Sequence, residues 1–142
     1  MKRTPFIILA ALAFSLNLHA NLGETQEELF KRYGKATDSV GTKAGFGTHF
    51  WRTSSTSQSA EMSQWKCMKE EFIGVDSSTL NRVMRTYEKP GQTWNGSVGL
   101  LLANETRVFR MKGEGLEKGK TPVVKVTRDA KRVVYRAEFT WE

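Results

Sequence analysis

The sequence contains very few residues that cross-link a chain or hold a metal: of 142 residues, one is cysteine and two are histidine. A single cysteine, Cys67, cannot form an intramolecular disulfide bond, so packing alone must stabilise the fold. His19 lies in an expected signal peptide, which leaves His49 as the histidine of the mature chain. A typical zinc site needs three or four closely placed ligands, so we expect neither a metal nor a cofactor.

The same shortage removes the common catalytic arrangements. A Ser-His-Asp or Cys-His site would have to use His49, and nothing in the spacing brings it to Cys67. We expect His49 on a strand surface or under a loop, and Cys67 as a small buried residue, with intermolecular pairing or a reactive thiol as alternatives. Glu70 and Glu71 are neighbours that would point to opposite faces of a strand, so they do not form an acid–base couple. The sequence therefore predicts no catalytic residues.

Long apolar runs are also missing, except near the start of the chain. Residues 1–20 have the form of a secretory signal peptide, with a basic start, an apolar stretch over 6–16 and a cleavage bond between Ala20 and Asn21. The apolar stretch is shorter than the ~20 residues that a membrane-spanning helix needs, and no cysteine near the cleavage site could carry a lipid anchor. We expect one domain over 21–142 that is secreted or periplasmic and does not span a membrane after cleavage.

The clearest local pattern is a helix at the start of this domain. Thr25 and Glu28 have the spacing of a capping box, in which each side chain satisfies a backbone N–H of the other. Leu29 and Tyr33 are apolar residues on one side of the following turns. Gly34 can adopt the positive φ angle that ends many helices.

The rest of the chain predicts a second helix and a set of strands. Alternating or β-branched stretches indicate strands at 46–53, 65–75, 79–88, 107–111, 123–127 and 132–141. Helical spacing of Trp94, Val98 and Leu101 predicts a helix at 97–104. Polar or glycine-rich stretches predict loops at 36–45, 54–63 and 112–121 and turns at 76–78 and 128–131. This order favours an α+β fold, an antiparallel sheet with two short helices packed on one face.

Basic residues are concentrated near the C-terminus. Between 106 and 136 there are ten Lys or Arg against three acidic residues, a net charge of +7, while the rest of 21–142 carries −2. Such asymmetry attracts anionic partners, although a solvated strand face is the alternative. The candidate binding surface comprises Lys125, Arg128, Lys131, Arg132 and Arg136. Tyr135 and Trp141 alternate onto the face opposite Arg132 and Arg136, unlike a base-stacking platform, so we expect no nucleic-acid partner.

Two short motifs carry a resemblance to known proteins. Leu22-Gly23-Glu24-Thr25 followed by Arg32-Tyr33-Gly34-Lys35 resembles the start of a group of small exported bacterial proteins that are largely uncharacterised, and residues 94–104 look like the second helix of that group. A short helix that ends in glycine before antiparallel strands is also similar to the plan of SmpA/OmlA-type outer-membrane assembly lipoproteins and of β-lactamase inhibitory proteins. These motifs are helix caps, so the resemblance implies a fold and no functional residue.

The missing catalytic groups and the uneven charge favour an exported, non-enzymatic binding or accessory protein of the cell envelope. Its expected partner is an acidic protein or an anionic envelope component. The alternatives are a small secreted hydrolase with an unrecognised site and an inhibitor-like protein, which would need a rigid protruding loop such as 54–63. Trp51 and Trp94 lie near predicted loops and are candidate anchors for a partner, although we expect both to pack in the core.

Overall fold

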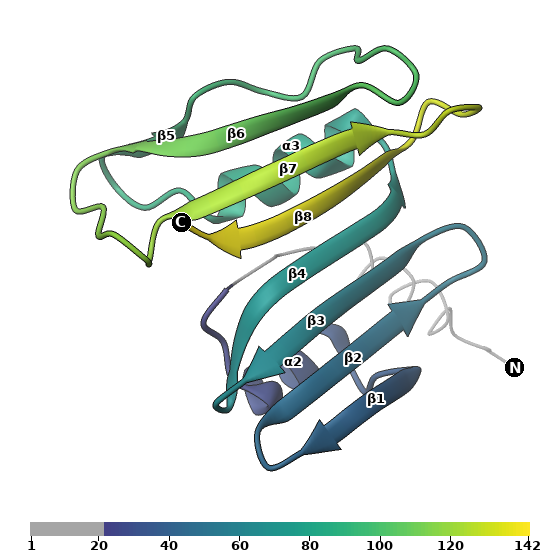
Figure 1. The fold of residues 1–142 in the computed structure, drawn as a ribbon, viewed down its shortest axis with the longest axis vertical. Helices are drawn as coiled ribbons and strands as arrows, with labels where there is room; N and C mark the ends of the chain where they lie inside the picture. Colours follow the sequence, from purple (N-terminus) through teal and green to yellow (C-terminus); the bar gives the residue numbers. More distant parts are fainter. Residues whose placement is uncertain (1–21) are drawn as a thin grey trace, which may run out of the picture.

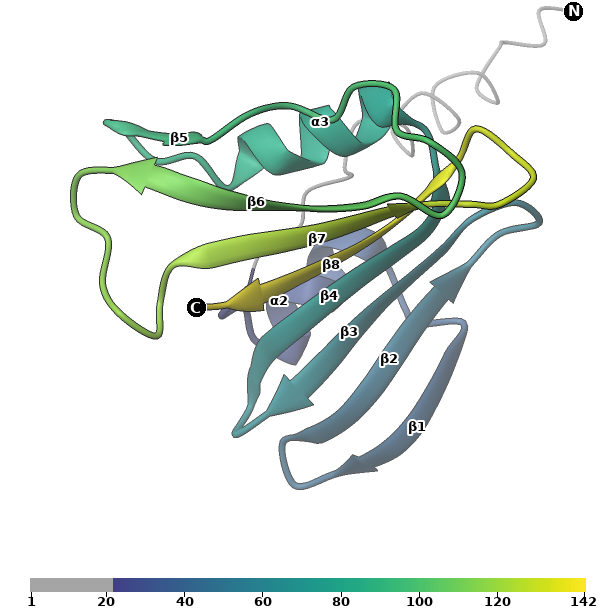
Figure 2. The ribbon, with the colours of Figure 1, turned by 45° about the horizontal axis from the view of Figure 1, so that its top comes forward.

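The computed structural model describes residues 22–142, which form an eight-stranded antiparallel sheet and two helices (Figure 1). The helices are α2 (Gln26–Tyr33) and α3 (Ser77–Thr86). The strands are β1 (Asp38–Lys43), β2 (Phe46–Arg52), β3 (Ser57–Ser63), β4 (Lys66–Val75), β5 (Gln92–Trp94), β6 (Thr106–Gly113), β7 (Pro122–Arg128) and β8 (Tyr135–Trp141). The predicted fold class is confirmed: both helices lie behind the sheet in Figure 1, and in the turned view of Figure 2 α3 is seen above β6 and α2 behind β4 and β8. The predicted signal peptide and its cleavage bond lie outside the described residues.

The sheet is built from two meanders that meet in its centre. The strand order is β1-β2-β3-β4-β8-β7-β6-β5. Each half of the chain supplies a helix and then four strands, α2 with β1 to β4 and α3 with β5 to β8. The halves join where β4 pairs with β8, with Phe72 opposite Ala137. The first strand of each half therefore lies at an edge, and the last strand of each half lies in the middle.

The capping box of α2 forms as predicted. The N–H of Thr25 donates to the Glu28 carboxylate at 2.7 Å, and the N–H of Glu28 donates to the Thr25 hydroxyl at 3.3 Å. Leu29 is fully buried against the sheet, and Gly34 ends the helix with φ of +78°. The local sequence thus determines where this helix begins and ends.

Two of the predicted loops contain strands. The prediction of a loop at 36–45 is wrong because β1 occupies Asp38–Lys43, and the loop at 54–63 is wrong because β3 occupies Ser57–Ser63. β1 is an edge strand whose residues are all exposed, so it carries no apolar alternation. In β3, Gln58, Ala60 and Met62 face the core, and they alternate with Ser57, Ser59, Glu61 and Ser63. The high serine content hid this alternation.

The predicted strand at 79–88 is the helix α3. Leu80, Val83 and Met84 are buried on one side, which is helical spacing. The predicted turn at 76–78 is the helix start, because the carboxylate of Asp76 accepts the N–H of Thr79 at 2.7 Å and acts as an N-cap. β-branched and aromatic residues in this stretch favoured a strand, and packing on the sheet outweighs that preference.

The predicted helix at 97–104 is wrong, because this segment is irregular. Val98 and Leu101 are buried with the spacing that predicted the helix. The backbone of this segment accepts hydrogen bonds from side chains of α3, β7 and β8 and does not form a helical ladder. Asn104 has the expected positive φ, +60°, but in a turn before β6.

β4 carries two irregularities that change which residues face the core. Simple alternation over the predicted strand at 65–75 places Trp65, Cys67, Ile73 and Val75 on one face, but Trp65, which lies in the turn before β4, and Ile73 are both exposed. The register shifts opposite Glu61/Met62 and again between Ile73 and Val75, where Gly74 has φ of +81°. Each shift inserts a residue and reverses the alternation. Glu70 is consequently buried on the same face as the apolar core.

The remaining strands follow the predictions at their centres. β2, β6 and β7 cover the expected stretches, and β8 buries Tyr135, Ala137 and Phe139 in the expected alternation. β8 starts at Tyr135 rather than 132, and Val133 is exposed in the preceding loop. Phe139 is central in the core, stacked on Tyr87 at 4.8 Å between ring centroids. Within 22–142, neither helix has the length and apolar character that a bilayer crossing requires.

Candidate functional site

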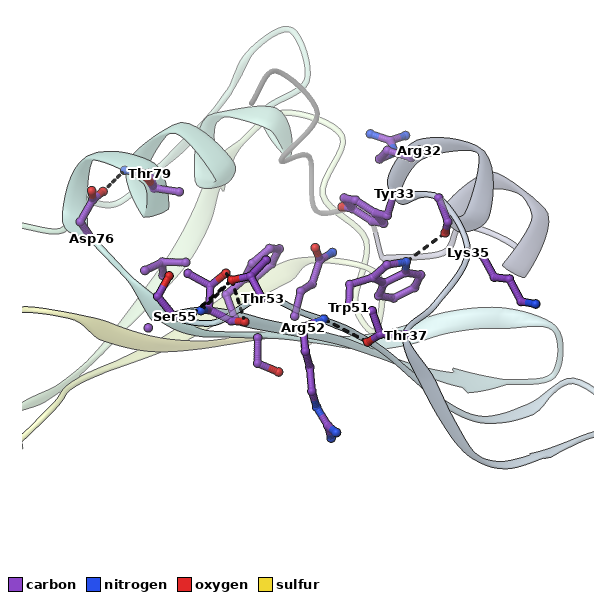
Figure 3. Close-up of a pocket in the computed structure, with 17 residues that line it drawn as sticks. Arg32, Tyr33, Lys35, Thr37, Trp51, Arg52, Thr53, Ser55, Asp76 and Thr79 are labelled. Atoms are coloured by element: carbon purple, nitrogen blue, oxygen red, sulfur yellow. Dashed lines mark hydrogen bonds between the residues drawn. The ribbon is translucent and has the colours of Figure 1, made fainter. Parts of the chain in front are cut away.

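A cavity of about 810 Å³ lies between the two helices, with the sheet as its floor (Figure 3). We call it the interhelical cavity. Its walls come from the end of α2, the β2–β3 connection, the end of β4 and the start of α3, with Tyr33 and Trp51 on one side and Asp76 and Thr79 on the other. Small-molecule sites have volumes of about 300–1,000 Å³, so this cavity is large enough to hold a ligand.

The aromatic wall of the cavity is fixed in place. The indole N–H of Trp51 donates to the Gly34 carbonyl at 3.0 Å. The rings of Trp51 and Tyr33 are 5.3 Å apart between centroids, and Phe30 packs edge-on behind Trp51 at 6.1 Å. Phe72 lines the same cavity from β4. A ligand would therefore meet a preformed apolar surface.

Two buried donors in the cavity lining lack a hydrogen-bond partner among the described residues. Gln58, on β3, is 7% exposed, and neither its Nε2 nor the hydroxyl of Tyr33 completes a hydrogen bond. Burial raises the pKa of Tyr33 well above its ordinary value, and the charge of Glu70 raises it further. The Gln58 amide opposes this shift, but it does not reach hydrogen-bond geometry with the hydroxyl. Both hydrogen-bond donors are therefore buried and unsatisfied in the described part of the chain.

A buried carboxylate lies beside this pair of donors. Glu70 on β4 has no exposed surface, and the hydroxyl of Tyr87 donates to its Oε2 at 3.0 Å. Burial raises the pKa of Tyr87 and of the Cys67 thiol, and the charge of Glu70 adds to both effects. The deep end of the cavity is therefore unfavourable for a second negative charge.

The charged groups at the cavity rim do not converge on its interior. Arg32 is bound to the Glu24 carboxylate. Arg52 pairs with Asp38 at 3.6 Å. Figure 3 shows the side chains of Arg52 and Lys35 pointing away from the cavity. The cavity therefore lacks the convergent cations of an anion site.

A second feature is an irregular segment, residues 99–105, with a rigidly held backbone. It follows Val98, whose peptide makes two hydrogen bonds with Asn81 of α3. The hydroxyl of Tyr135 donates to the Gly99 carbonyl at 3.2 Å, and the guanidinium of Arg128 donates to the Leu101 carbonyl at 2.6 Å. These bonds come from three different elements, so they fix the segment in one conformation.

This segment exposes two leucines. Leu101 is buried, whereas Leu100 and Leu102 are 74% and 73% exposed. Residues 129–134, which join β7 to β8, lie beside it, because the N–H of Asn104 donates to the carbonyl of Arg128 at 3.2 Å. Val133 in that loop is 57% exposed. We call residues 99–105 and 129–134 together the loop end.

The five predicted basic residues do not form one surface. Lys131 and Arg132 lie exposed at the loop end, and in the described part of the chain their side chains form no ion pair. Their backbone N–H groups both donate to the Asp129 carboxylate, at 2.8 and 2.9 Å, which fixes the turn. Arg128 is partly buried and holds the Leu101 carbonyl.

Arg136 and Lys125 lie elsewhere, on the open face of the sheet. The guanidinium of Arg136 is 2.8 Å from the Glu71 carboxylate and 3.6 Å from that of Glu138. Glu71 raises the pKa of Arg136 by accepting this hydrogen bond. Lys125 lies opposite Glu138 in the strand register. Acidic neighbours therefore offset the positive charge on this face.

His49 and Cys67 are both buried and lie apart. The prediction that His49 lies on a strand surface or under a loop is wrong: it is 3% exposed on the helix-covered face of β2, with its ring 5.0 Å from that of Phe30. Its Nδ1 is 2.8 Å from the Ser39 hydroxyl, and burial lowers its pKa. Because β3 separates β2 from β4, the strands that carry His49 and Cys67 are two strand spacings apart, about 10 Å in total. Cys67 is a buried residue, as expected.

The remaining sequence candidates have structural positions. Trp94 is buried and its indole donates to the Met84 carbonyl at 2.6 Å, so it packs in the core. Trp51 is half-buried in the cavity wall. Glu70 and Glu71 point to opposite faces, as predicted. Among residues 22–142, no group of three or more His, Cys, Asp or Glu side chains could hold a metal ion.

Sequence reasoning missed Gln58 and the exposed leucines. Gln58 alternates with Ala60 and Met62, so the period of two within 57–63 could have placed it on the inner face. Leu100 and Leu102 flank Leu101 in an apolar run, and nothing in that run says which leucine is buried. The rigid protruding loop that an inhibitor-like protein would need is not found at 54–63, because β3 occupies Ser57–Ser63.

No protein-family model, curated protein or solved structure matches the chain. The resemblance to small exported bacterial proteins therefore stays a prediction.

Proposed function

We propose that this chain is an exported, non-enzymatic binding protein of the cell envelope that docks on an anionic lipid surface through its loop end. The observation that carries the proposal is the rigid presentation of Leu100 and Leu102 to solvent beside Lys131 and Arg132. Export rests on the signal-peptide pattern of residues 1–20.

The loop end combines the two contributions that surface binding to membranes requires. Burying a leucine side chain in an apolar phase stabilises by about 1.5–3 kcal/mol, and a Lys or Arg near an anionic surface adds about 1 kcal/mol. One weak anchor gives marginal attachment, whereas two kinds of anchor together give stable binding. Because the segment is already ordered, binding carries little additional entropy cost.

The chemistry of the exposed residues favours a lipid surface over a protein partner. Protein interfaces concentrate their binding energy in Trp, Tyr and Arg, and Leu and Val are under-represented among such residues. The exposed apolar residues here are aliphatic: Leu100, Leu102 and Val133. They lie on connections at one end of the sheet, where β7 ends and β8 begins (Figure 1).

Vesicle sedimentation tests the proposal. We expect the protein to sediment with phosphatidylglycerol vesicles and much less with phosphatidylcholine vesicles, and salt should weaken the binding. The double variants Leu100→Ser/Leu102→Ser and Lys131→Glu/Arg132→Glu should each lose most of it. Equal sedimentation with both lipids, or unchanged sedimentation of both double variants, would overturn the proposal.

A matched control changes the same charge at the other end of the sheet. Lys112, near the end of β6, and Lys118, in the β6–β7 connection, are both exposed. They are far from the loop end, because the loop end lies where β6 begins and β7 ends. Lys112→Glu/Lys118→Glu should retain more binding than the loop-end charge variant. Equal losses would show that net charge, and not the loop end, drives attachment.

A further inference from the structure

We infer that the interhelical cavity binds a neutral acyl ester or acyl amide, with the ligand carbonyl accepting a hydrogen bond from Gln58 and the apolar chain packing on Trp51 and Phe72. This site is separate from the loop end, so the inference does not depend on membrane docking. Three features support it: unpaired donors, surroundings that favour a neutral acceptor, and an apolar wall.

The first feature is the pair of donors. More than nine-tenths of buried polar groups in proteins have a hydrogen-bond partner. Gln58 is 93% buried, with its Nε2 unpaired among the described residues, and the Tyr33 hydroxyl beside it is unpaired as well. Both groups line the same cavity. A buried side-chain NH₂ and a buried phenolic hydroxyl, both from residues that line one cavity, require an acceptor.

The second feature concerns the charge of that acceptor. Burial and then the nearby Glu70 carboxylate raise the pKa of Tyr33, and an ionised Glu70 would repel a carboxylate or phosphate placed at the donors. The rim arginine Arg32 is bound to Glu24, and Arg52 points away from the cavity. A neutral carbonyl oxygen satisfies the donors without adding negative charge.

The third feature is the surface around the donors. Tyr33, Trp51, Phe72 and Val75 all line the cavity. The indole of Trp51 is held by Gly34 at 3.0 Å, so this wall does not need to reorganise on binding. An aliphatic chain gains stability by displacing water from such a surface. Ester and amide ligands share the carbonyl, and the experiment distinguishes them.

The test is a titration followed by ¹⁵N amide spectra of the protein. The probes are methyl decanoate, N-methyldecanamide and sodium decanoate. The Gln58 side-chain signal is identified by its loss in Gln58→Leu, and we expect it to shift with the ester, the amide or both. The Gln58→Leu variant should bind the active probe about tenfold more weakly, as the loss of one hydrogen bond predicts. Gln26→Leu, at an exposed position, should bind as the wild type does.

Filling the cavity provides an independent check. Thr79 lines the cavity from α3, while its neighbour Ser78 is exposed. Thr79→Trp should abolish the titration and Ser78→Trp should not. A response to one neutral probe supports the inference and identifies the linkage. No shift of the Gln58 signal with either neutral probe, tighter binding of decanoate, or equal binding by both tryptophan variants would overturn it.

Discussion

Asn81 holds both polar groups of the Val98 peptide: its Nδ2 donates to the Val98 carbonyl at 2.9 Å and its Oδ1 accepts the Val98 N–H at 2.7 Å. The side chain therefore takes the place of a β-strand partner for one residue. This contact ties α3 to a segment with no regular structure of its own. The position of the exposed leucines that follow depends on it.

Replacing Asn81 should loosen this segment. Asn81→Leu leaves two partly buried backbone groups of Val98 without partners, at a cost of about 1–3 kcal/mol in the free energy of unfolding. Hydrogen exchange at the Val98 amide should accelerate, while exchange in β3 and β4 changes less. Exchange that accelerates equally across the sheet would show a global loss of stability instead of local loosening.

Gln58→Leu should stabilise the protein in the absence of ligand. The substitution removes a buried donor that lacks a partner among the described residues, and an unsatisfied donor costs about 1–3 kcal/mol. We expect the urea midpoint to rise by an amount equivalent to about 1 kcal/mol, while Gln26→Leu has little effect. A lower midpoint for Gln58→Leu would show that the amide has a stabilising partner.

Asp76 should contribute to acid destabilisation. The N–H of Thr79 stabilises the ionised carboxylate and lowers the pKa of Asp76 below its ordinary value of 3.8. The ionised carboxylate therefore contributes its full stabilisation above about pH 3.8, the ordinary pKa of Asp. This contribution is lost as the pH falls through the lower pKa of the folded state.

Asp76→Asn provides the comparison for this pH dependence. Asn also caps helices but does not titrate. Urea midpoints measured from pH 7 to pH 2 should fall less steeply below pH 4 in the variant than in the wild type. Parallel pH profiles would contradict a role for this carboxylate.

Arg132 and Arg136 should differ in their effects on docking. Arg136 is paired with Glu71 at 2.8 Å on the open face of the sheet, whereas Arg132 lies at the loop end without an ion pair among the described residues. Arg132→Glu should reduce sedimentation with phosphatidylglycerol vesicles several-fold. Arg136→Glu should reduce it less, and should cost roughly 0.2–1 kcal/mol of stability through repulsion by Glu71. Equal losses of vesicle binding in the two variants would show that the open face of the sheet also belongs to the binding surface.

The sequence predicted those elements whose determinants are local. The capping box of Thr25 and Glu28 defined the start of α2, and strict alternation placed Tyr135 and Phe139 in the core. α3 was missed because its buried residues have helical spacing but several of its residue types prefer strands. β1 was missed because every residue in it is exposed, so that no pattern of burial marks it.

The candidate sites depend on contacts between distant parts of the chain. The interhelical cavity requires the spacing between α2 and α3 over the sheet, and no local pattern encodes that distance. The sequence around Gln58 predicts a loop, and its buried position becomes clear only from the pairing of β3 with β2 and β4. The fixed conformation around Leu101 depends on Arg128, far away in the sequence. Local sequence patterns therefore predict several helices and strands, but they do not predict the interhelical cavity or the loop end.

The pairing of β4 with β8 makes the order of synthesis important for folding. β4 ends at Val75, and its partner strand runs over Tyr135–Trp141, next to the C-terminus. A growing chain can complete its first meander while β4 still has an open edge. Unpaired edges bind other strands, and pairing between distant segments is slow. The sheet closes only when the last seven strand residues arrive, so a chain that is short by one strand exposes the centre of the sheet rather than its margin.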